Sequence, residues 1–177
     1  MHRLFVAIRP PEDVLAPLID LMEGVAGARW QSEDQLHLTL RFIGEVDARQ
    51  AEDIDTVLQS VRHPRFDVAL SGLGFFERRG QPAVFWAGVS PHDPLNALHK
   101  KIDHALERAG FVPERRAYHP HITLARFGRD AGSLQPLLAR CGAVASAPFT
   151  VTEFRLYKSR LTPAGAEHTL LACYSLT

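Results

Sequence analysis

Apolar and polar residues follow one another along the first half of the chain in segments that predict alternating strands and helices. Short apolar runs rich in β-branched and aromatic residues predict strands, whereas apolar residues spaced three or four apart predict helices. The predicted strands cover residues 4–8, 36–43 and 66–73, and the predicted helices cover residues 12–25 and 48–61. The first half therefore has the order β-α-β-α-β.

The second half repeats this order. The strands predicted here cover residues 83–89, 121–127 and 149–159, the helices cover residues 94–110 and 133–141, and a last strand covers residues 168–176. Gly110 closes the longer helix, as glycine commonly does. No low-complexity segment or linker separates the halves. The pattern predicts a two-lobed α+β protein with pseudo-twofold symmetry, folded as a single bilobal domain over residues 1–177.

One phrase occurs in both halves, as HLTLRFIG at residues 37–44 and as HPHITLARFG at residues 119–128. On a strand, successive side chains point to opposite faces. His37 therefore shares a face with Thr39, and His121 shares a face with Thr123. Each strand presents an imidazole and a hydroxyl together, while the leucine or isoleucine between them faces a core.

Packing, metal binding and acid–base catalysis are three interpretations of this repeat. A packing role is disfavoured because imidazoles are costly to bury without partners. A zinc site built on His119 and His121 lacks further ligands in the sequence, and Pro120 stiffens the link. His99 and His104 lie five residues apart on a helix, so we expect them to be solvated. We predict neither a metal nor a cofactor.

Acid–base catalysis fits the repeat best. Imidazole has a reference pKa of about 6.5, so one histidine can be neutral while the other is protonated near neutral pH. The neutral histidine takes a proton from a nucleophile and the charged one gives a proton to a leaving oxygen, which suits phosphodiester cleavage. The neighbouring threonines can donate to phosphate oxygens, and Arg41 and Arg126 can balance the phosphate charge.

Paired H-x-T-L motifs in two halves of a chain of this size resemble the 2H phosphoesterase superfamily. Within it, the chain is similar to the RNA 2',3'-cyclic phosphodiesterases, also called 2'-5' RNA ligases. The resemblance extends over RLFVAIRPP, LHLTLRFIGE, YHPHITLARFG and FRLYKSRLTPAG, and so over nearly the whole sequence. It implies antiparallel sheets around a central cleft with interleaved lobes, and metal-independent opening of an RNA 2',3'-cyclic phosphate to a 2'-phosphomonoester.

The resemblance also implies roles for individual residues. His37 is the proton donor to the departing 3' oxygen, and His121 is the proton acceptor that activates water. The implied substrate contacts are two threonines, an arginine and an aromatic residue that stacks on the terminal base: Thr39, Thr123, Arg126 and Phe42. In reverse, with a 5'-hydroxyl partner, the same histidines would exchange roles and form a 2'-5' linkage.

Strict alternation conflicts with two of these assignments. It places Arg41 on the face of His37, but it places Phe42 and Arg126 on the opposite faces of their strands. We predict that alternation fails after each motif, through a bulge or strand end near Gly44 and Gly128.

Two other histidines need an interpretation: His119, two residues before His121, and His168, near the end of the chain. We expect His119 to support His121. His168 stands where the family often has an aromatic residue, and we assign it no catalytic role.

The composition of the chain limits the kinds of binding partner that we expect. Hydrophobic residues make up 46% of the 177 residues, charged residues 23%, and the formal net charge is zero, which argues against broad adhesion to nucleic acid or anionic lipid. Cys141 and Cys173 have no metal or disulfide pattern.

With no predicted signal peptide or membrane span, we expect a cytoplasmic monomer acting on RNA ends. Small cyclic nucleotides, ADP-ribose cyclic phosphate, or noncatalytic binding of RNA ends are the alternatives.

Overall fold

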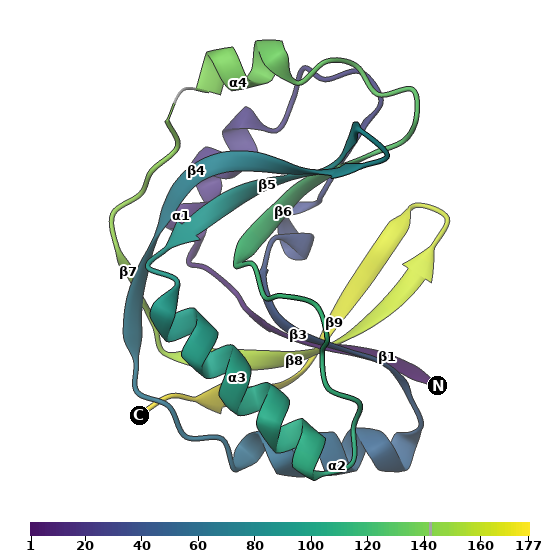
Figure 1. The fold of residues 1–177 in the computed structure, drawn as a ribbon, viewed down its shortest axis with the longest axis vertical. Helices are drawn as coiled ribbons and strands as arrows, with labels where there is room; N and C mark the ends of the chain where they lie inside the picture. The colour runs from purple at the N-terminus through teal and green to yellow at the C-terminus, as the bar shows by residue number, and fades with distance from the viewer. Residues whose placement is uncertain (142) are drawn as a thin grey trace.

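The computed structural model describes residues 1–141 and 143–177 (Figure 1). Its strands are β1 (His2–Ile8), β2 (Ala28–Trp30), β3 (Leu38–Val46), β4 (Phe66–Arg78), β5 (Gln81–Ser90), β6 (His121–Phe127), β7 (Phe149–Val151), β8 (Glu153–Thr162) and β9 (Gly165–Ser175). They pair antiparallel in the order β7-β4-β5-β6-β3-β1-β8-β9, with β2 attached to β6. The two-lobed α+β prediction is confirmed, and the sheet is one curled surface.

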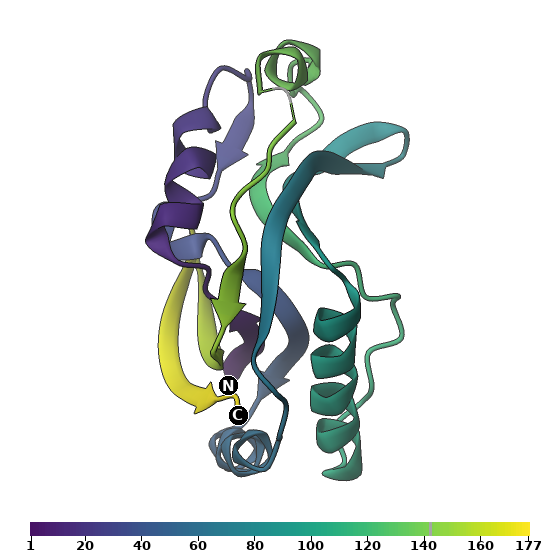
Figure 2. The same ribbon diagram turned by 90° about the vertical axis from the view of Figure 1, so that its left-hand side faces the viewer.

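The helices are α1 (Glu12–Leu21), the short 3-10 helix η1 (Glu33–Gln35), α2 (Ala48–Gln59), α3 (Asp93–Arg108) and α4 (Gln135–Cys141). At the start of α2, the Asp47 carboxylate accepts from the Gln50 amide, and the Gln50 side chain accepts in return from Asp47. α2 and α4 lie at opposite ends of the molecule (Figures 1 and 2). Within the described residues, no helix has the length and apolarity needed to cross a membrane.

Most of the predicted helices and strands are present, but several begin or end at other residues than predicted. The predicted strand at 121–127 matches β6, whereas the predicted helix at 12–25 ends already at Leu21. The predicted strand at 149–159 is wrong as a single element. It divides at Thr152, because β7 pairs with β4 in one lobe and β8 pairs with β1 in the other. β2 and η1 were not predicted, since three residues are too few to show a period.

The two halves of the chain exchange strands. β4 ends the first half but pairs with β5, whereas β8 comes from the second half and pairs with β1. The lobes meet where β3 and β6 pair at Leu38 and Ile122. These residues occupy the same position in the two motifs, each directly after its histidine. A local twofold axis therefore passes between the two motifs.

Gly74 on β4 makes room for Trp86 on β5. A Cβ atom at Gly74 would lie 2.4 Å from the Trp86 ring, and that ring packs against His119 and His121 with centroid distances of 5.0 and 6.2 Å. Gly74→Ala is expected to lower the free energy of unfolding by about 2 kcal/mol, as overpacking does, measured by urea denaturation. Gly128→Ala is the control, because a Cβ there meets nothing within 4 Å. Equal stabilities of the two variants would contradict this account.

Candidate active site

A large cleft runs between the two lobes, and both motifs line it. Its volume is about 1090 Å³, slightly above the usual range for small-molecule sites. All six residues predicted from the sequence are among its lining residues: His37, Thr39, Phe42, His121, Thr123 and Arg126. Residues that are 79 or more positions apart in the sequence thus share one cavity.

The strand register sets the arrangement of the two histidines and two threonines. Because Leu38 pairs with Ile122, antiparallel geometry puts His37 opposite Thr123 and Thr39 opposite His121. The histidines therefore occupy one diagonal of a four-residue square and the threonines the other. Diagonal neighbours of this kind have backbone positions about 7–8 Å apart, a separation that leaves space for a phosphate group between the imidazoles.

Each motif contains a bulge directly after its threonine. On β3, Ala7 pairs with Thr39 but Val6 pairs with Arg41, so Leu40 is an extra residue. On β6, Trp86 pairs with Thr123 but Phe85 pairs with Ala125, so the extra residue is Leu124. Each extra residue reverses the alternation that follows it.

The reversal brings Phe42 and Arg126 to the cleft side of their strands, and both are exposed. The predicted failure of alternation is therefore confirmed. The bulges that cause it lie earlier than Gly44 and Gly128, although β3 has a second register shift just before Gly44.

Arg41 is not a free cation. Its side chain is buried, its Nε donates to Asp103 at 2.7 Å, and Glu114 lies 3.8 Å from its Nη1. Its Nη2 also donates to the Val112 carbonyl. Arg41 also lines the cleft, but two carboxylates already offset its charge, which argues against the suggestion that it balances a substrate phosphate.

Both motif histidines are held by the backbone two residues earlier. Nδ1 of His121 lies 2.6 Å from the His119 carbonyl oxygen, and His37 makes a hydrogen bond to the backbone of Gln35. An imidazole that donates one N–H to a carbonyl keeps its other nitrogen available as a base. His119 thus supports His121, as expected, through its carbonyl group.

His99 and Tyr118 brace β3 at its bulge. His99 is buried, its Nδ1 lies 2.7 Å from the Leu40 carbonyl, and its ring stacks on Tyr118 at 4.2 Å. The Tyr118 hydroxyl donates to the Thr39 carbonyl at 3.1 Å, and burial raises its pKa. The expectation that His99 is solvated is wrong. It lies on the buried face of α3 next to Leu98 and Ile102, which the helical spacing could have indicated.

The surroundings lower the pKa of both motif histidines and so disfavour their charged forms. Burial, reinforced by the charges of His168 and Arg9, lowers the pKa of His37 from 6.5 to about 3. Burial also lowers the pKa of His121, and Arg126 acts in the same direction. An anion bound between the imidazoles would oppose these effects and favour their charged forms.

The cleft is cationic although the whole chain is neutral. Three arginines that line it have no carboxylate partner among the described residues: Arg3, Arg29 and Arg126. A fourth, the exposed Arg116, lies 3.6 Å from Glu114. Glu114, which also lies beside Arg41, is the only acidic residue among the described residues that line the cleft. The sequence did not reveal Arg3 and Arg29, because their positions in the cleft depend on how β1 and β2 pair.

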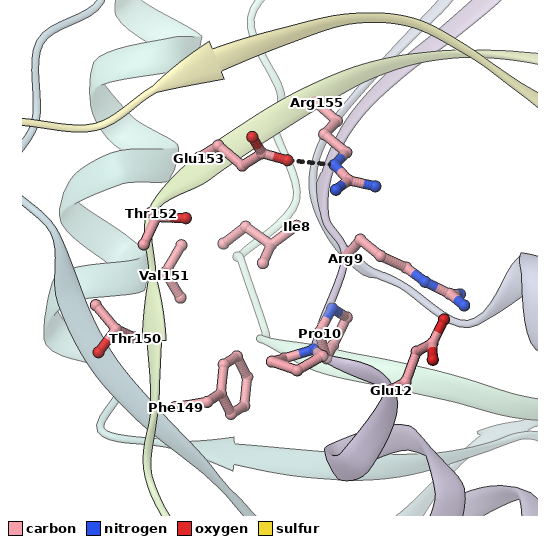
Figure 3. Close-up of a pocket in the computed structure, with 11 residues that line it drawn as sticks. Ile8, Arg9, Pro10, Glu12, Phe149, Thr150, Val151, Thr152, Glu153 and Arg155 are labelled. Atoms are coloured by element: carbon pink, nitrogen blue, oxygen red, sulfur yellow. Dashed lines mark hydrogen bonds and ion pairs between the residues drawn. The ribbon is translucent and has the colours of Figure 1, made fainter.

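A second, smaller cavity of about 340 Å³ lies beside the end of β1 (Figure 3). Glu153 and Arg155 form an ion pair of 2.7 Å at its edge. Arg9 also lines it and donates to the Glu33 and Leu36 carbonyls at 2.5 and 2.7 Å, so it fixes the segment that leads to His37. This cavity contains neither motif.

No group of three or more histidine, cysteine, aspartate or glutamate side chains converges anywhere in residues 1–141 and 143–177 in a way that could hold a metal ion. Most polar side chains of the cleft are instead imidazoles, hydroxyls and guanidinium groups, together with two amides and the Glu114 carboxylate. This set of groups matches an anionic ester that is bound by hydrogen bonds and processed by proton transfer.

Two histidine–threonine pairs, related by a local twofold axis and facing one cationic cleft, define the 2H phosphoesterase class. The family model for the 2'-5' RNA ligase superfamily matches residues 10–162, and the chain belongs to this family.

Individual relatives and structures agree with this assignment. The chain is 39% identical to the RNA 2',3'-cyclic phosphodiesterase of Aeropyrum pernix over 75% of its length and 77% of that protein. It is 33% identical to the Thermotoga maritima RNA 2',3'-cyclic phosphodiesterase over 96% of its length and 92% of that protein. The crystal structure of Escherichia coli LigT with 3'-AMP superposes with a TM-score of 0.82 at 30% identity, covering 99% of this chain and 98% of that one.

Proposed function

We propose that this protein hydrolyses 2',3'-cyclic phosphate ends of RNA to 2'-phosphomonoesters. The observation that carries the proposal is the pair of histidines on one diagonal of the β3–β6 crossing, each with a threonine opposite it in the same cleft. Relatives at 39% and 33% identity that are named for this activity support the choice of substrate.

In the proposed reaction, a water molecule attacks phosphorus on the side of the ester facing His121. Neutral His121 accepts the proton of the water, and the bond between phosphorus and the 3' oxygen breaks. His37, protonated in the complex, donates its proton to that oxygen. The phosphate stays on the 2' oxygen. No step requires a metal ion.

The remaining predicted residues bind the substrate. The hydroxyls of Thr39 and Thr123 donate to the nonbridging phosphate oxygens, and Arg126 offsets the charge that develops on them. Phe42, which is 42% exposed, offers a ring face on which the terminal base stacks. With a 5'-hydroxyl in place of water, the reversed reaction forms a 2'-5' linkage.

The two lobes act together in this proposal, as a single bilobal unit over residues 1–177. Each supplies one histidine, and β4 and β8 each join the sheet of the other half. A monomeric state and a cytoplasmic location stay predictions from the sequence.

The proposal is tested by offering the protein an RNA oligonucleotide with a 2',3'-cyclic phosphate end and a 2',3'-cyclic mononucleotide, both in excess EDTA. We expect both to be opened, and kcat/KM to be at least tenfold higher for the oligonucleotide, because Arg3 and Arg29 extend the cationic lining beyond the histidines. A preference for the mononucleotide would favour a small-nucleotide phosphodiesterase. Binding without turnover would favour an RNA-end binding module.

The lowered pKa values predict an unusual pH profile. Productive binding needs His37 charged and His121 neutral, whereas in the free protein the pKa of His37 is about 3 and that of His121 is below 6.5. Protonated His37 therefore becomes scarcer as pH rises, and kcat/KM is expected to fall about tenfold per pH unit above pH 6.5. The kcat optimum should lie at higher pH, because bound phosphate raises both pKa values. A kcat/KM maximum above pH 7.5 would contradict these assignments.

A further inference from the structure

His168 on β9 lies in the cleft, directly against His37. The two ring centroids are 5.2 Å apart in an edge-to-face arrangement, and the His168 ring also meets Phe5 edge-on at 4.8 Å. The side chain is half-buried, lines the same cavity as the two motifs, and makes no hydrogen bond to the described residues through either ring nitrogen. Its nitrogens are therefore available to a ligand in the cleft.

The hairpin that carries His168 is fixed in place by the same residue that holds His37. The Gln35 side-chain amide donates to the Ala166 carbonyl, two residues before His168, while the backbone of Gln35 bonds to His37. The relative position of the two imidazoles is thus set by one short segment. The contact between the His37 and His168 rings is therefore held by specific hydrogen bonds of Gln35 and is not accidental packing.

The local twofold axis shows what the His37 side of the cleft lacks. Five residues after His121 the chain places Arg126 in the cleft, but five residues after His37 it places Phe42. Arg41, the only arginine of that motif, is neutralised by Asp103 and Glu114. The β3 motif therefore supplies no cation of its own for the phosphate.

His168, on β9, provides an ionisable cationic group on the His37 side of the cleft. After burial, the largest charge effect on the pKa of His37 comes from His168, with a smaller one from Arg9. The charge effects on the pKa of His121 come from His119 and, to a smaller extent, from Arg126. In the cleft, an ionisable ring on β9 thus lies beside His37, whereas a permanent cation on β6 lies near His121.

We propose that His168 is the second cationic contact of the substrate phosphate, an ionisable counterpart of Arg126 that binds the anion on the His37 side of the cleft. This inference rests on the proposed function for the identity of the anion. Burial lowers the pKa of His168, and a bound anion would act in the opposite direction and favour the charged ring. The site would bind phosphate more tightly as pH falls.

Few other charged groups lie near His168. Among the described residues on this side of the cleft they are Arg3 from β1, Tyr157 from β8, His37 itself and Arg9, whose charge acts on His37. Glu167, the preceding residue, is exposed and lies 3.4 Å from Arg160. Because arginine side chains are not deprotonated in proteins, a change in anion affinity between pH 5 and 8 belongs to the histidines.

The test uses protein labelled with ¹³C at histidine Cε1 and inorganic sulfate, which stays a dianion throughout the titration. NMR follows each histidine with and without sulfate. Sulfate is expected to raise the midpoints of His37, His121 and His168, the last by about one pH unit. A His168 midpoint that stays fixed while those of His37 and His121 move would overturn the inference.

Two variants separate charge from packing. His168→Phe keeps a ring against Phe5 and His37, and is expected to weaken sulfate binding about fivefold at pH 5 but not at pH 8. His168→Lys carries its charge at both values and is expected to strengthen binding severalfold at pH 8. If His168 only fills space, His168→Phe binds sulfate as tightly as the parent protein at pH 5, and that result would also overturn the inference.

Turnover of the cyclic-phosphate oligonucleotide by the unmodified protein is measured in the same buffers. Activity together with a fixed His168 midpoint would reject the role of His168 and leave the proposed function standing. Absence of activity together with a sulfate-induced shift would reject the proposed function and leave His168 as an anion contact.

Discussion

Replacing His37 or His121 with alanine is expected to lower kcat/KM for an RNA 2',3'-cyclic phosphate by about 10³-fold, because each change removes one proton-transfer group. The double variant should be only slightly worse than either single one, since a donor without its acceptor contributes little. Steady-state kinetics with a cyclic-ended oligonucleotide measure this.

His104→Ala is the matched control for these variants. The His104 side chain is 70% exposed on α3 and lies outside the cleft lining, so its loss should leave both activity and stability unchanged. Unfolding free energies of the His37 and His121 variants should stay within about 1 kcal/mol of the parent. Loss of stability in place of activity would instead indicate that the repeated motif serves packing.

The two motif arginines are expected to give opposite results. Arg126→Met should lower kcat/KM by about 10²-fold with little change in stability, because Arg126 is exposed in the cleft and contacts only the substrate in our proposal. Arg41→Met should lower the free energy of unfolding by about 3 kcal/mol, because it leaves the Asp103 carboxylate without its partner. The folded fraction of this variant should keep near-parent activity.

A second change can restore the Arg41 variant. Arg41→Met combined with Asp103→Leu removes both charges, and replacing both partners of a buried pair by apolar residues is often neutral. We expect the double variant to recover most of the lost stability in urea denaturation. If Arg41→Met lost activity but not stability, Arg41 rather than Arg126 would be the phosphate contact.

These contrasts show what the sequence could and could not predict. The two histidines and two threonines were predictable because a strand alternates faces and because the motif occurs twice. Arg126 and Phe42 were out of phase with that alternation; the resemblance alone nominated Phe42, and it selected Arg126 over Arg41. The bulges at Leu40 and Leu124 that bring them into the cleft leave no mark in a hydrophobic pattern, because an extra leucine looks like any other core residue.

His168 could not be predicted for a different reason. It lies 131 residues after His37 in the sequence, and their contact depends on β8 crossing to pair with β1. Because the predicted strand at 149–159 divides into β7 and β8, the C-terminal hairpin lies in the other lobe. Long-range strand exchange of this kind is set by tertiary pairing and not by local propensity.

The most direct test of the account is product analysis from one RNA oligonucleotide that ends in a 2',3'-cyclic phosphate, treated with the purified protein in excess EDTA. The account predicts a 2'-phosphate as the only product, because His37 gives its proton to the 3' oxygen while His121 activates the water. A 3'-phosphate product, or no opening of the ring without added metal, would contradict it.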